Sequence, residues 1–319
     1  MRSLEPKLHQ FLESAPIFFQ PWWLEAVAPG LWDYAVARKG EEITGIFAYT
    51  AKRKAGCWRL LEMPPLTPWL GPWLRPSAAK YANRLSEEKE VLSELIAALP
   101  PFANLDMNFP PHLTNWLPFY WQGFHQTTCY TYRFEETADP KALWDETRPN
   151  IRTDVRKAEK VVKVKITDDL DQFLRVNRLT FERQGKPLPY AEATLREMDR
   201  QCAQRSARRI LIAEDAQGRI HAGVYLVTDA KTVYYLMGGG DPELRNSGAT
   251  SLLVWKAIEW ASETARAFDF EGSMVEPIER FVRSFGARQT PCFSILKSNS
   301  FMVGFYRALW RLTHRSPWT

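Results

Sequence analysis

Gly123-Phe-His-Gln-Thr-Thr-Cys-Tyr130 and Gly286-Ala-Arg-Gln-Thr-Pro-Cys-Phe293 share the pattern G-x-x-Q-T-x-C-aromatic, although they lie in different halves of the chain. Each glycine stands where a predicted helix ends and a predicted strand begins, a position that glycine favours at helix C-termini. The two stretches also occur at the same point of two similar series of elements. Internal similarity of this kind indicates a tandem duplication.

Both series are predicted to run strand–strand–strand–helix–strand–helix–strand, from the alternation and helical spacing of apolar residues. The first is expected at residues 34–38, 43–50, 58–62, 87–99, 103–109, 115–121 and 127–134. The second is expected at residues 209–214, 222–228, 233–237, 250–264, 267–271, 277–284 and 292–296. Helices at 140–160 and 168–183, with a strand at 161–166, are expected to join them. We therefore predict the α/β class, with an α+β mixed sheet, in two tandem domains related by duplication, 1–137 and 138–319.

The composition is that of a globular protein, with 45% apolar and 25% charged residues among 319. The net charge of +5 suits an anionic ligand but is too small to indicate a DNA-binding domain. The four cysteines are far apart and form no C-x-x-C pair, so neither a metal site nor a disulfide framework is predicted. They favour a reducing compartment, and no secretion signal is recognisable, so a cytoplasmic location is expected.

The tail over 300–319 is predicted to be a helix, because Arg307, Arg311 and Arg315 stand at helical spacing opposite apolar side chains. Two interpretations stay open for it. It packs back on the first domain, or it lies in a membrane interface as a peripheral contact. No run of 18 apolar residues occurs, so no membrane span is predicted.

The stretch GGGDPELRNSGAT, from Gly238 to Thr250, joins a predicted strand to a long predicted helix. Glycines let the backbone approach a ligand closely. The first N–H groups of the helix have no intrahelical partner and lie at its positive dipole end. Together these features favour a phosphate site. The alternative is a plain chain reversal in which the glycines serve only the turn.

Arg245, Gly248 and Thr250 occupy the positions of R-x-x-G-x-[GA], so the stretch resembles the acyl-donor pyrophosphate loop of the GNAT acyltransferase superfamily. Thr250 departs from the small residue that is usual at the third position. The resemblance implies that Arg245, Gly248, Ala249 and Thr250 bind the donor phosphates. It implies no tightly bound cofactor, because the donor, an acyl-CoA or an aminoacyl-tRNA, is a co-substrate.

The second half resembles more specifically the FemAB-like branch of this superfamily, whose members contain two GNAT-like domains. The marks are a basic helix at 151–160, a Trp-containing helix at 252–260, FDFEG at 268–272, and a segment at 281–286 similar to the family's F-K-x-x-F-G. Val282 stands in place of that Lys, so its basic role is either lost or passed to Arg283 as a substrate-binding residue. The chain lacks the long helical arm of the bridge-forming members that use aminoacyl-tRNA.

The first half has no glycine-rich loop at the corresponding point. It has a proline-rich stretch from Pro64 to Trp73, which lacks the N–H donors of a phosphate cradle. This stretch is expected to present Trp69 and Trp73 as rigid, substrate-binding walls of a cleft. The first domain is therefore expected to bind the acceptor or to support the second.

Acyl transfer to an amine needs a group that takes the amine proton. Asp269 and Glu271 stand two positions apart on a predicted strand, so both should point to one face beside the cleft. Either is a candidate for the catalytic base. Alternatively, Asp269 caps a neighbouring element and Glu271 is solvated; in many GNAT enzymes the proton leaves through water.

Basic residues recur every four positions on the helix expected at 140–160, namely Arg148, Arg152, Arg156 and Lys160. On one face, Arg152 and Arg156 would bind a phosphate-bearing acceptor or a tRNA backbone. The alternative is a solvated helix face.

Residues and resemblance together lead us to expect an N-acyltransferase. It would move an acyl or aminoacyl group from acyl-CoA or aminoacyl-tRNA to the amine of a small molecule or a cell-wall precursor, without a covalent enzyme intermediate. The rival expectation is a non-catalytic binding module, a degenerate acyltransferase pair that recognises an anionic or lipid-linked saccharide.

Overall fold

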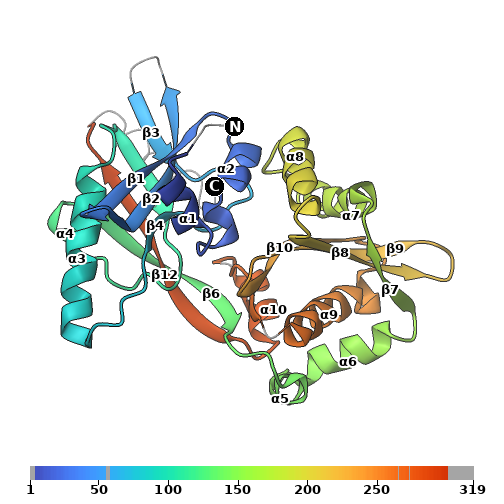
Figure 1. The fold of residues 1–319 in the computed structure, drawn as a ribbon. Helices are drawn as coiled ribbons and strands as arrows, with labels where there is room; N and C mark the ends of the chain where they lie inside the picture. The colour runs from blue at the N-terminus through green and yellow to red at the C-terminus, as the bar shows by residue number, and fades with distance from the viewer. Residues whose placement is uncertain (1–3, 55–57, 265, 273, 301–319) are drawn as a thin grey trace. The chain divides into compact units, whose positions relative to one another are not determined.

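The computed structural model describes residues 4–54, 58–264, 266–272 and 274–300. The chain forms two compact units (Figure 1). Among the described residues, one unit contains those up to 130 together with 291–300, and the other contains those within 131–290. Each unit has parallel and antiparallel strand pairs and its own helices. The predicted α/β class with a mixed sheet is confirmed.

The first unit has a sheet with helices packed on it. Its strands follow the order β1 (Trp32–Lys39), β2 (Glu42–Lys54), β3 (Trp58–Glu62), β5 (Asn104–Asn108) and β12 (Arg288–Ser298), and β4 (Gly71–Leu74) also pairs with β2. Its helices are α1 (Pro6–Leu12), α2 (Pro21–Val27), α3 (Tyr81–Ala97) and α4 (Leu117–Trp121).

The second unit repeats this plan with more helices. Its strands follow the order β6 (His125–Phe134), β11 (Ala267–Asp269), β10 (Thr232–Gly240), β9 (Ile220–Thr228), β8 (Arg208–Asp215) and β7 (Val162–Thr167). Its helices are α5 (Pro140–Glu146), α6 (Pro149–Ala158), α7 (Leu170–Arg183), α8 (Glu192–Ala203), α9 (Ala249–Glu263) and α10 (Glu276–Arg283).

The last strand of each series is exchanged between the units. β6 ends the first series but pairs with β11, Arg133 standing opposite Asp269. β12 ends the second series but pairs with β5, Ser294 standing opposite Asn108. The two units therefore do not correspond to a single division of the chain near residue 137, because residues 291–300 belong with the first unit.

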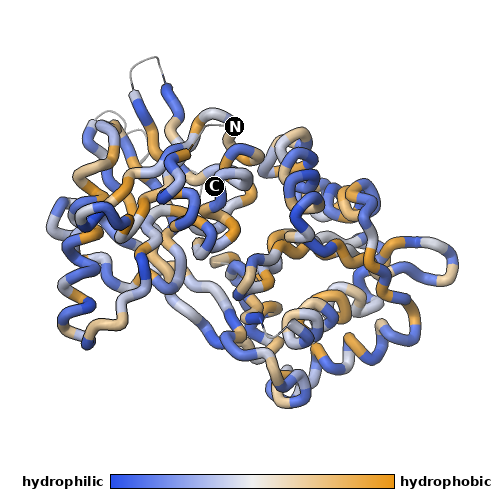
Figure 2. Tube along the Cα trace, in the orientation of Figure 1, coloured by the Kyte–Doolittle hydropathy of each residue, from blue (hydrophilic) through white to orange (hydrophobic). Residues whose placement is uncertain are grey.

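Alternate residues of β9 face two helical layers in the second unit. Ala222 and Val224 belong to the apolar cluster that contains α9. Gly223 faces α7 instead, where an added Cβ would lie 3.1 Å from Val176. The apolar colouring of α9 and of the strands beneath it in Figure 2 follows from this arrangement, since α9 is buried along most of its length.

The two glycines of the repeated pattern adopt the expected conformation. Gly123 and Gly286 have φ angles of 75° and 89°, in the left-handed region, and each follows a short helix and precedes a strand. The two cysteines of the pattern, Cys129 and Cys292, are both buried. The residue-level similarity between the two halves thus corresponds to the same local geometry in both.

Two expectations need correction. The helix expected at 140–160 is two helices, α5 and α6, because Pro149 cannot continue a helix and instead occupies the start of the second. The proline-rich stretch is not wholly irregular, since Gly71–Leu74 forms β4 against β2. The helix expected over 300–319 lies outside the described residues, which end at residue 300.

Candidate functional site

β10 and β11 pair over only three residues each, Thr232–Tyr234 with Ala267–Asp269, and then part. β11 ends at Asp269, whereas β10 continues to Gly240 with β9 on its other edge. The β9 pairing shifts register between Tyr235 and Met237, as at a β-bulge. Beyond Tyr234, one edge of β10 therefore has no strand partner within the described residues. Two backbone groups on this part of β10 are already engaged by α7: the oxygen of Gly238 accepts from the side-chain amide of Asn177 at 3.0 Å, and the N–H of Gly240 donates to the hydroxyl of Thr180 at 3.0 Å.

Asp269 lies where the two strands part, and it is fully buried. Its Oδ1 accepts hydrogen bonds from the hydroxyl of Thr131 at 2.5 Å and from the backbone N–H of Glu271 at 2.8 Å. Its Oδ2 accepts from the guanidinium of Arg133. Burial raises the pKa of Asp269, and the charge of Arg133 opposes that rise. With both oxygens engaged and no exposed surface, Asp269 is placed to hold its neighbours rather than to touch an acceptor.

Glu271 lies just beyond β11, which corrects the expectation that both carboxylates share that strand. Its φ of 57° is left-handed, a conformation that is uncommon outside glycine and that concentrates at functional sites. Its Oε1 is shielded from solvent and has no hydrogen-bond partner among the described residues. Burial first, and then the charge of Asp269, raise the pKa of Glu271 well above its ordinary value. A carboxyl group in this state is suited to general acid–base chemistry near neutral pH.

The glycines of the expected phosphate loop are explained in part by close packing. A Cβ on Gly239 would lie 2.5 Å from the backbone of Asn177 on α7. A Cβ on Gly248, whose φ is 81°, would lie 2.4 Å from the backbone oxygen of Asp154 on α6. Both glycines therefore let a helix approach the loop closely, which is the role that the alternative interpretation gave them.

The N-terminus of α9 combines groups that attract and repel an anion. Gly248 is its N-cap and supplies no side-chain cap, so the first N–H groups of α9 keep no intrahelical acceptor. Arg245 is exposed on the turn before α9 and has no ion pair among the described residues. Against these, a carboxylate oxygen of Asp154 lies 3.5 Å from the hydroxyl of Ser251 in the first turn. The site offers amide donors and two cations, since Lys157 donates to the backbone oxygen of Asn246 in the same turn, with the acidic side chain of Asp154 beside them.

Two of the basic residues expected as one stripe, Arg152 and Arg156, both lie against α5 but differ in exposure. Arg152 is half-buried and donates to the backbone oxygen of Asp145 at 3.3 Å. Arg156 is exposed, and its guanidinium lies 5.9 Å from the ring centre of Trp144. Arg152 is thus turned toward α5, while Arg156 keeps its charge available to a ligand.

Val282 lies where a basic side chain would be shielded from solvent. It is 3% exposed within the apolar cluster of the second unit. Arg283 next to it is exposed and pairs with Glu279 at 2.7 Å. Glu279 also accepts from the phenol of Tyr132 at 2.5 Å, and Gln289 donates to that phenol at 2.9 Å. The charge of Arg283 therefore belongs to a polar network and does not replace a lysine at position 282.

The two tryptophans expected as cleft walls lie in the first unit. Trp69 is 2% exposed and belongs to the core, which corrects that expectation. Trp73 is half-buried on β4, with its ring centre 4.7 Å from that of His112 and 6.1 Å from that of Phe19. Both rings thus serve mainly the packing of the first unit.

Residues 145–277 match the family model of the acetyltransferase (GNAT) domain. The matched residues lie within the second unit, 131–290. GNAT enzymes use acyl-CoA as a co-substrate. Glu271 and the start of α9 therefore lie within the residues that match this family model.

Three solved structures share the fold over nearly the whole chain. FemX is 13% identical with a TM-score of 0.67, over 96% of this chain and 98% of that chain. L-PGS from Bacillus licheniformis is 12% identical with a TM-score of 0.57, over 95% of each chain. A tandem GNAT protein from the clavulanic acid biosynthesis pathway is 13% identical with a TM-score of 0.51, over 92% of each chain. These identities show the fold alone, and at that level the FemAB-like resemblance is confirmed. No curated protein matches the sequence.

The partners that hold the GNAT domain's carboxylates were not expected from the sequence. Thr131 and Arg133 come from β6, 138 and 136 positions before Asp269. Only the exchange of the last strands brings them beside β11, and no local pattern signals that exchange. Within the described residues, no group of three or more His, Cys, Asp or Glu side chains could hold a metal ion, and no helix could span a membrane.

Proposed function

We propose that this protein is an N-acyltransferase whose reacting groups meet where β10 and β11 part. The observation that carries the proposal is Oε1 of Glu271, which is shielded from solvent and has no hydrogen-bond partner among the described residues. Glu271 follows the point where β11 parts from β10. A carboxylate needs a reason to stay desolvated and unpaired, and proton transfer during catalysis is such a reason. Backbone N–H groups of β10 beyond Tyr234, other than that of Gly240, which donates to Thr180, would supply donors for the oxygen of a reacting carbonyl group.

In the proposed reaction, the amine of the acceptor attacks the carbonyl carbon of the donor in a ternary complex. A C–N bond forms, and the C–S bond of an acyl-CoA or the C–O ester bond of an aminoacyl-tRNA breaks. Glu271 takes the proton that the amine loses, and the leaving thiolate or alkoxide takes up a proton in turn. Asp269 acts through Glu271, because its Oδ1 accepts from the backbone N–H of that residue.

The donor phosphates are proposed to bind at the start of α9, on the N–H groups of Gly248, Ala249 and Thr250 and on Arg245. The lack of a side-chain cap from Gly248 and the exposed guanidinium support this placement, and a phosphate would compete with the hydroxyl of Ser247, which accepts from the N–H of Ala249 at 3.3 Å. Both acyl-CoA and aminoacyl-tRNA carry phosphates, so both stay in the proposal. The solved structures with this fold include FemX and a lysyl-phosphatidylglycerol synthetase, so an envelope precursor is the proposed acceptor class. The buried free cysteines favour a reducing, cytoplasmic setting.

A non-catalytic binding module is the second candidate. Two observations favour it, namely the carboxylate of Asp154 at the start of α9 and the apolar Val282 in place of the family's lysine. Such a module would bind an anionic or lipid-linked saccharide without turnover.

The two candidates are separated by an assay for amide formation. The protein would be incubated with labelled acyl-CoAs or aminoacyl-tRNAs and with amine-bearing cell-wall precursors, and products would be identified by mass spectrometry. Turnover that Glu271→Gln slows strongly supports the enzyme. Saccharide binding with no product from any donor would leave the binding module as the function.

The donor site has its own test by thermal shift, since a ligand that binds only the folded state raises the melting temperature. Arg245→Ala should remove the rise caused by acyl-CoA, whereas Asp154→Asn should increase it by removing a repelling charge. Lys163→Ala on β7 removes an exposed charge elsewhere and serves as the control. Equal shifts in all variants would exclude a donor site at the start of α9.

A further inference from the structure

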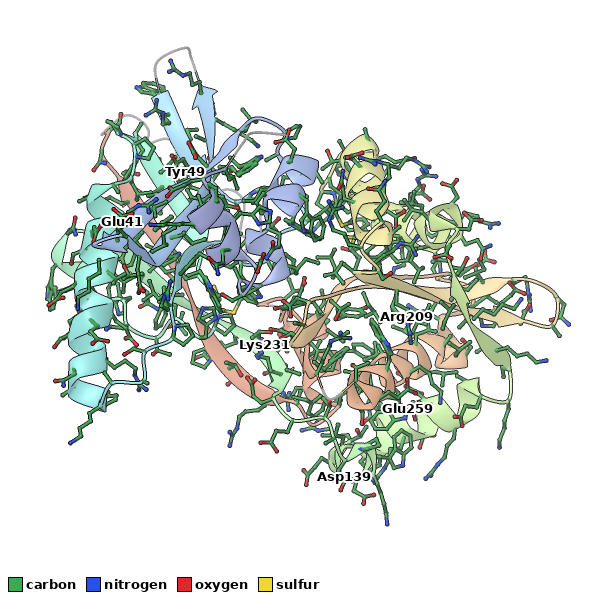
Figure 3. All side chains as sticks on the ribbon, in the orientation of Figure 1. Glu41, Tyr49, Asp139, Arg209, Lys231 and Glu259 are labelled. Atoms are coloured by element: carbon green, nitrogen blue, oxygen red, sulfur yellow. The ribbon has the colours of Figure 1, made fainter. Side chains whose placement is uncertain are left out.

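A cavity of about 380 Å³ opens among α5, α6 and α9, away from the carboxylates at the end of β11. It is lined by side chains of all three helices: Pro140, Lys141, Trp144, Val155, Arg156, Glu159, Trp255 and Glu259. Figure 3 labels Asp139, which caps the start of α5, and Glu259 on α9. The volume lies within the range typical of small-ligand sites.

Two indole rings form the apolar part of this cavity. The ring centres of Trp144 and Trp255 lie 4.6 Å apart, with an angle of 58° between the ring planes. Trp255 is held in place, because its indole N–H donates to Glu259 at 2.8 Å. Trp144 is only half-buried and keeps part of its ring accessible. A fixed indole surface favours a planar, aromatic ligand.

The charged side chains around the two rings differ in whether they already have an ion-pair partner. Glu259 is neutralised, since Lys256 pairs with it at 2.7 Å. Lys141 and Arg156 have no ion-pair partner in the described part of the chain, and both are exposed. Glu159 is exposed and likewise unpaired there. The guanidinium of Arg156 already lies over the ring of Trp144, 5.9 Å from its centre, so a base must share this ring with it. The cavity thus offers two free cations and one free carboxylate, which suits a ligand with an anionic group and a few hydroxyl or amino donors.

We propose that this cavity binds a nucleoside phosphate. The base packs against Trp144, the phosphate lies between Lys141 and Arg156, and Glu159 accepts from a sugar hydroxyl or a base amino group. A single nucleotide satisfies the aromatic, anionic and donor requirements together. The proposal does not depend on acyl transfer, because none of the lining residues belongs to the proposed reacting groups.

The direct test is titration of the purified full chain with adenosine 5′-monophosphate, adenosine and inorganic phosphate, read by tryptophan fluorescence and by calorimetry. Saturable binding of the nucleotide is expected, weaker binding of adenosine, and weakening with added salt because the phosphate contacts are ionic. Trp144→Phe should reduce the fluorescence change while leaving the calorimetric signal in place.

Charge variants then locate the site. Arg156→Gln and Lys141→Gln should each weaken nucleotide binding by about tenfold, as expected for loss of one charge-assisted contact. Lys160→Gln removes a cation from the same stripe of basic residues but not from the cavity, and should leave the affinity unchanged. All four variants change exposed or half-buried side chains, and circular dichroism would verify that they fold.

Two further ligands identify the natural source of the nucleotide. Coenzyme A and deacylated tRNA each carry a nucleoside phosphate within a larger molecule. If either binds more tightly than the free nucleotide and loses that advantage in Arg156→Gln, the cavity serves the larger molecule. Absence of saturable nucleotide binding, or binding that Arg156→Gln and Lys141→Gln leave unchanged, would overturn the proposal.

Discussion

The carboxylate of Asp269 accepts a hydrogen bond from the backbone N–H of Glu271 at 2.8 Å, so the first acidic residue fixes the backbone of the second. The same negative charge helps to raise the pKa of Glu271. Asp269 itself is balanced by Arg133 and is closed to solvent. One carboxylate thus sets the conformation and the proton affinity of the other, and the two residues take different roles.

Glu271→Gln should lower the turnover number by about 100- to 10,000-fold, the usual contribution of a general base. The wild-type rate should rise with pH as the carboxyl group ionises, at a pH above the range of an ordinary glutamate, because the pKa of Glu271 is raised. The variant should lack this rise. A pH–rate profile of both proteins checks it, and an unchanged acidic limb in Glu271→Gln would assign the titration to another group.

The same substitution should change the pH dependence of stability. A glutamate whose pKa is higher in the folded state binds more protons there, so the free energy of unfolding falls as pH rises from its ordinary pKa through the raised one. Glu271→Gln removes that fall. The variant should therefore gain stability over the wild type as pH increases through this window, as measured by urea unfolding at several pH values. A constant difference would mean that Glu271 is not desolvated in the native state.

Asp269→Asn should destabilise the second unit by about 3 kcal/mol, because it leaves the partly buried Arg133 without its buried partner. Arg133 keeps Glu135 at 2.8 Å, which limits the loss. Glu135→Gln changes an exposed side chain and should cost at most about 1 kcal/mol. Removal of the Asp269 charge should also lower the pKa of Glu271 and move the acidic limb of the rate profile to lower pH. A purely structural Asp269 would leave that limb in place.

Gly248→Ala should destabilise the protein more than Gly218→Ala. Both glycines are left-handed, with φ angles of 81° and 77°, so both variants lose about 1–2 kcal/mol to backbone strain. A Cβ on Gly218 meets nothing within 4 Å, whereas on Gly248 it meets the backbone of Asp154. Overpacking there should add about 1–3 kcal/mol. If both variants lose the same free energy of unfolding in denaturant, α6 does not pack closely against Gly248.

Val282→Lys, which restores the family's basic residue, should cost roughly 3–5 kcal/mol of stability, because it places an unpaired charge in the core. Arg283→Lys keeps an exposed charge beside Glu279 and should cost less than about 1 kcal/mol. The urea concentrations at the unfolding midpoints, compared at an unchanged m-value, measure both losses of stability. Higher activity in Val282→Lys with unchanged stability would show that position 282 reaches the substrate.

Much of the fold follows from local sequence patterns. The helix predicted at 250–264 is α9, Ala249–Glu263, because its apolar residues mark an element buried nearly all round. β4 was missed because prolines indicate a loop, yet Pro72 is tolerated in a short strand that lies off the main strand order. The exchange of β6 and β12 could not be predicted, since each strand is locally compatible with either sheet.

The candidate site was predictable only in its residue types. Glu271 was singled out as a carboxylate on a strand, and the structure places it just beyond the end of that strand. The left-handed turn at Glu271 and the partners of Asp269 depend on contacts with β6, more than a hundred positions earlier. The packing of Gly248 on α6 was likewise invisible, because a glycine that binds phosphate and one that admits a helix look the same in a sequence.

The pairing of β12 with β5 also has a consequence for biosynthesis. During synthesis, residues 131–290, which form the second unit, are made before most of β12, the strand that pairs with β5 in the first unit. The first unit therefore cannot complete its sheet until β12 has been synthesised. Until then the edge of β5 has no strand partner. A nascent chain stalled before residue 291 would expose that edge to aggregation.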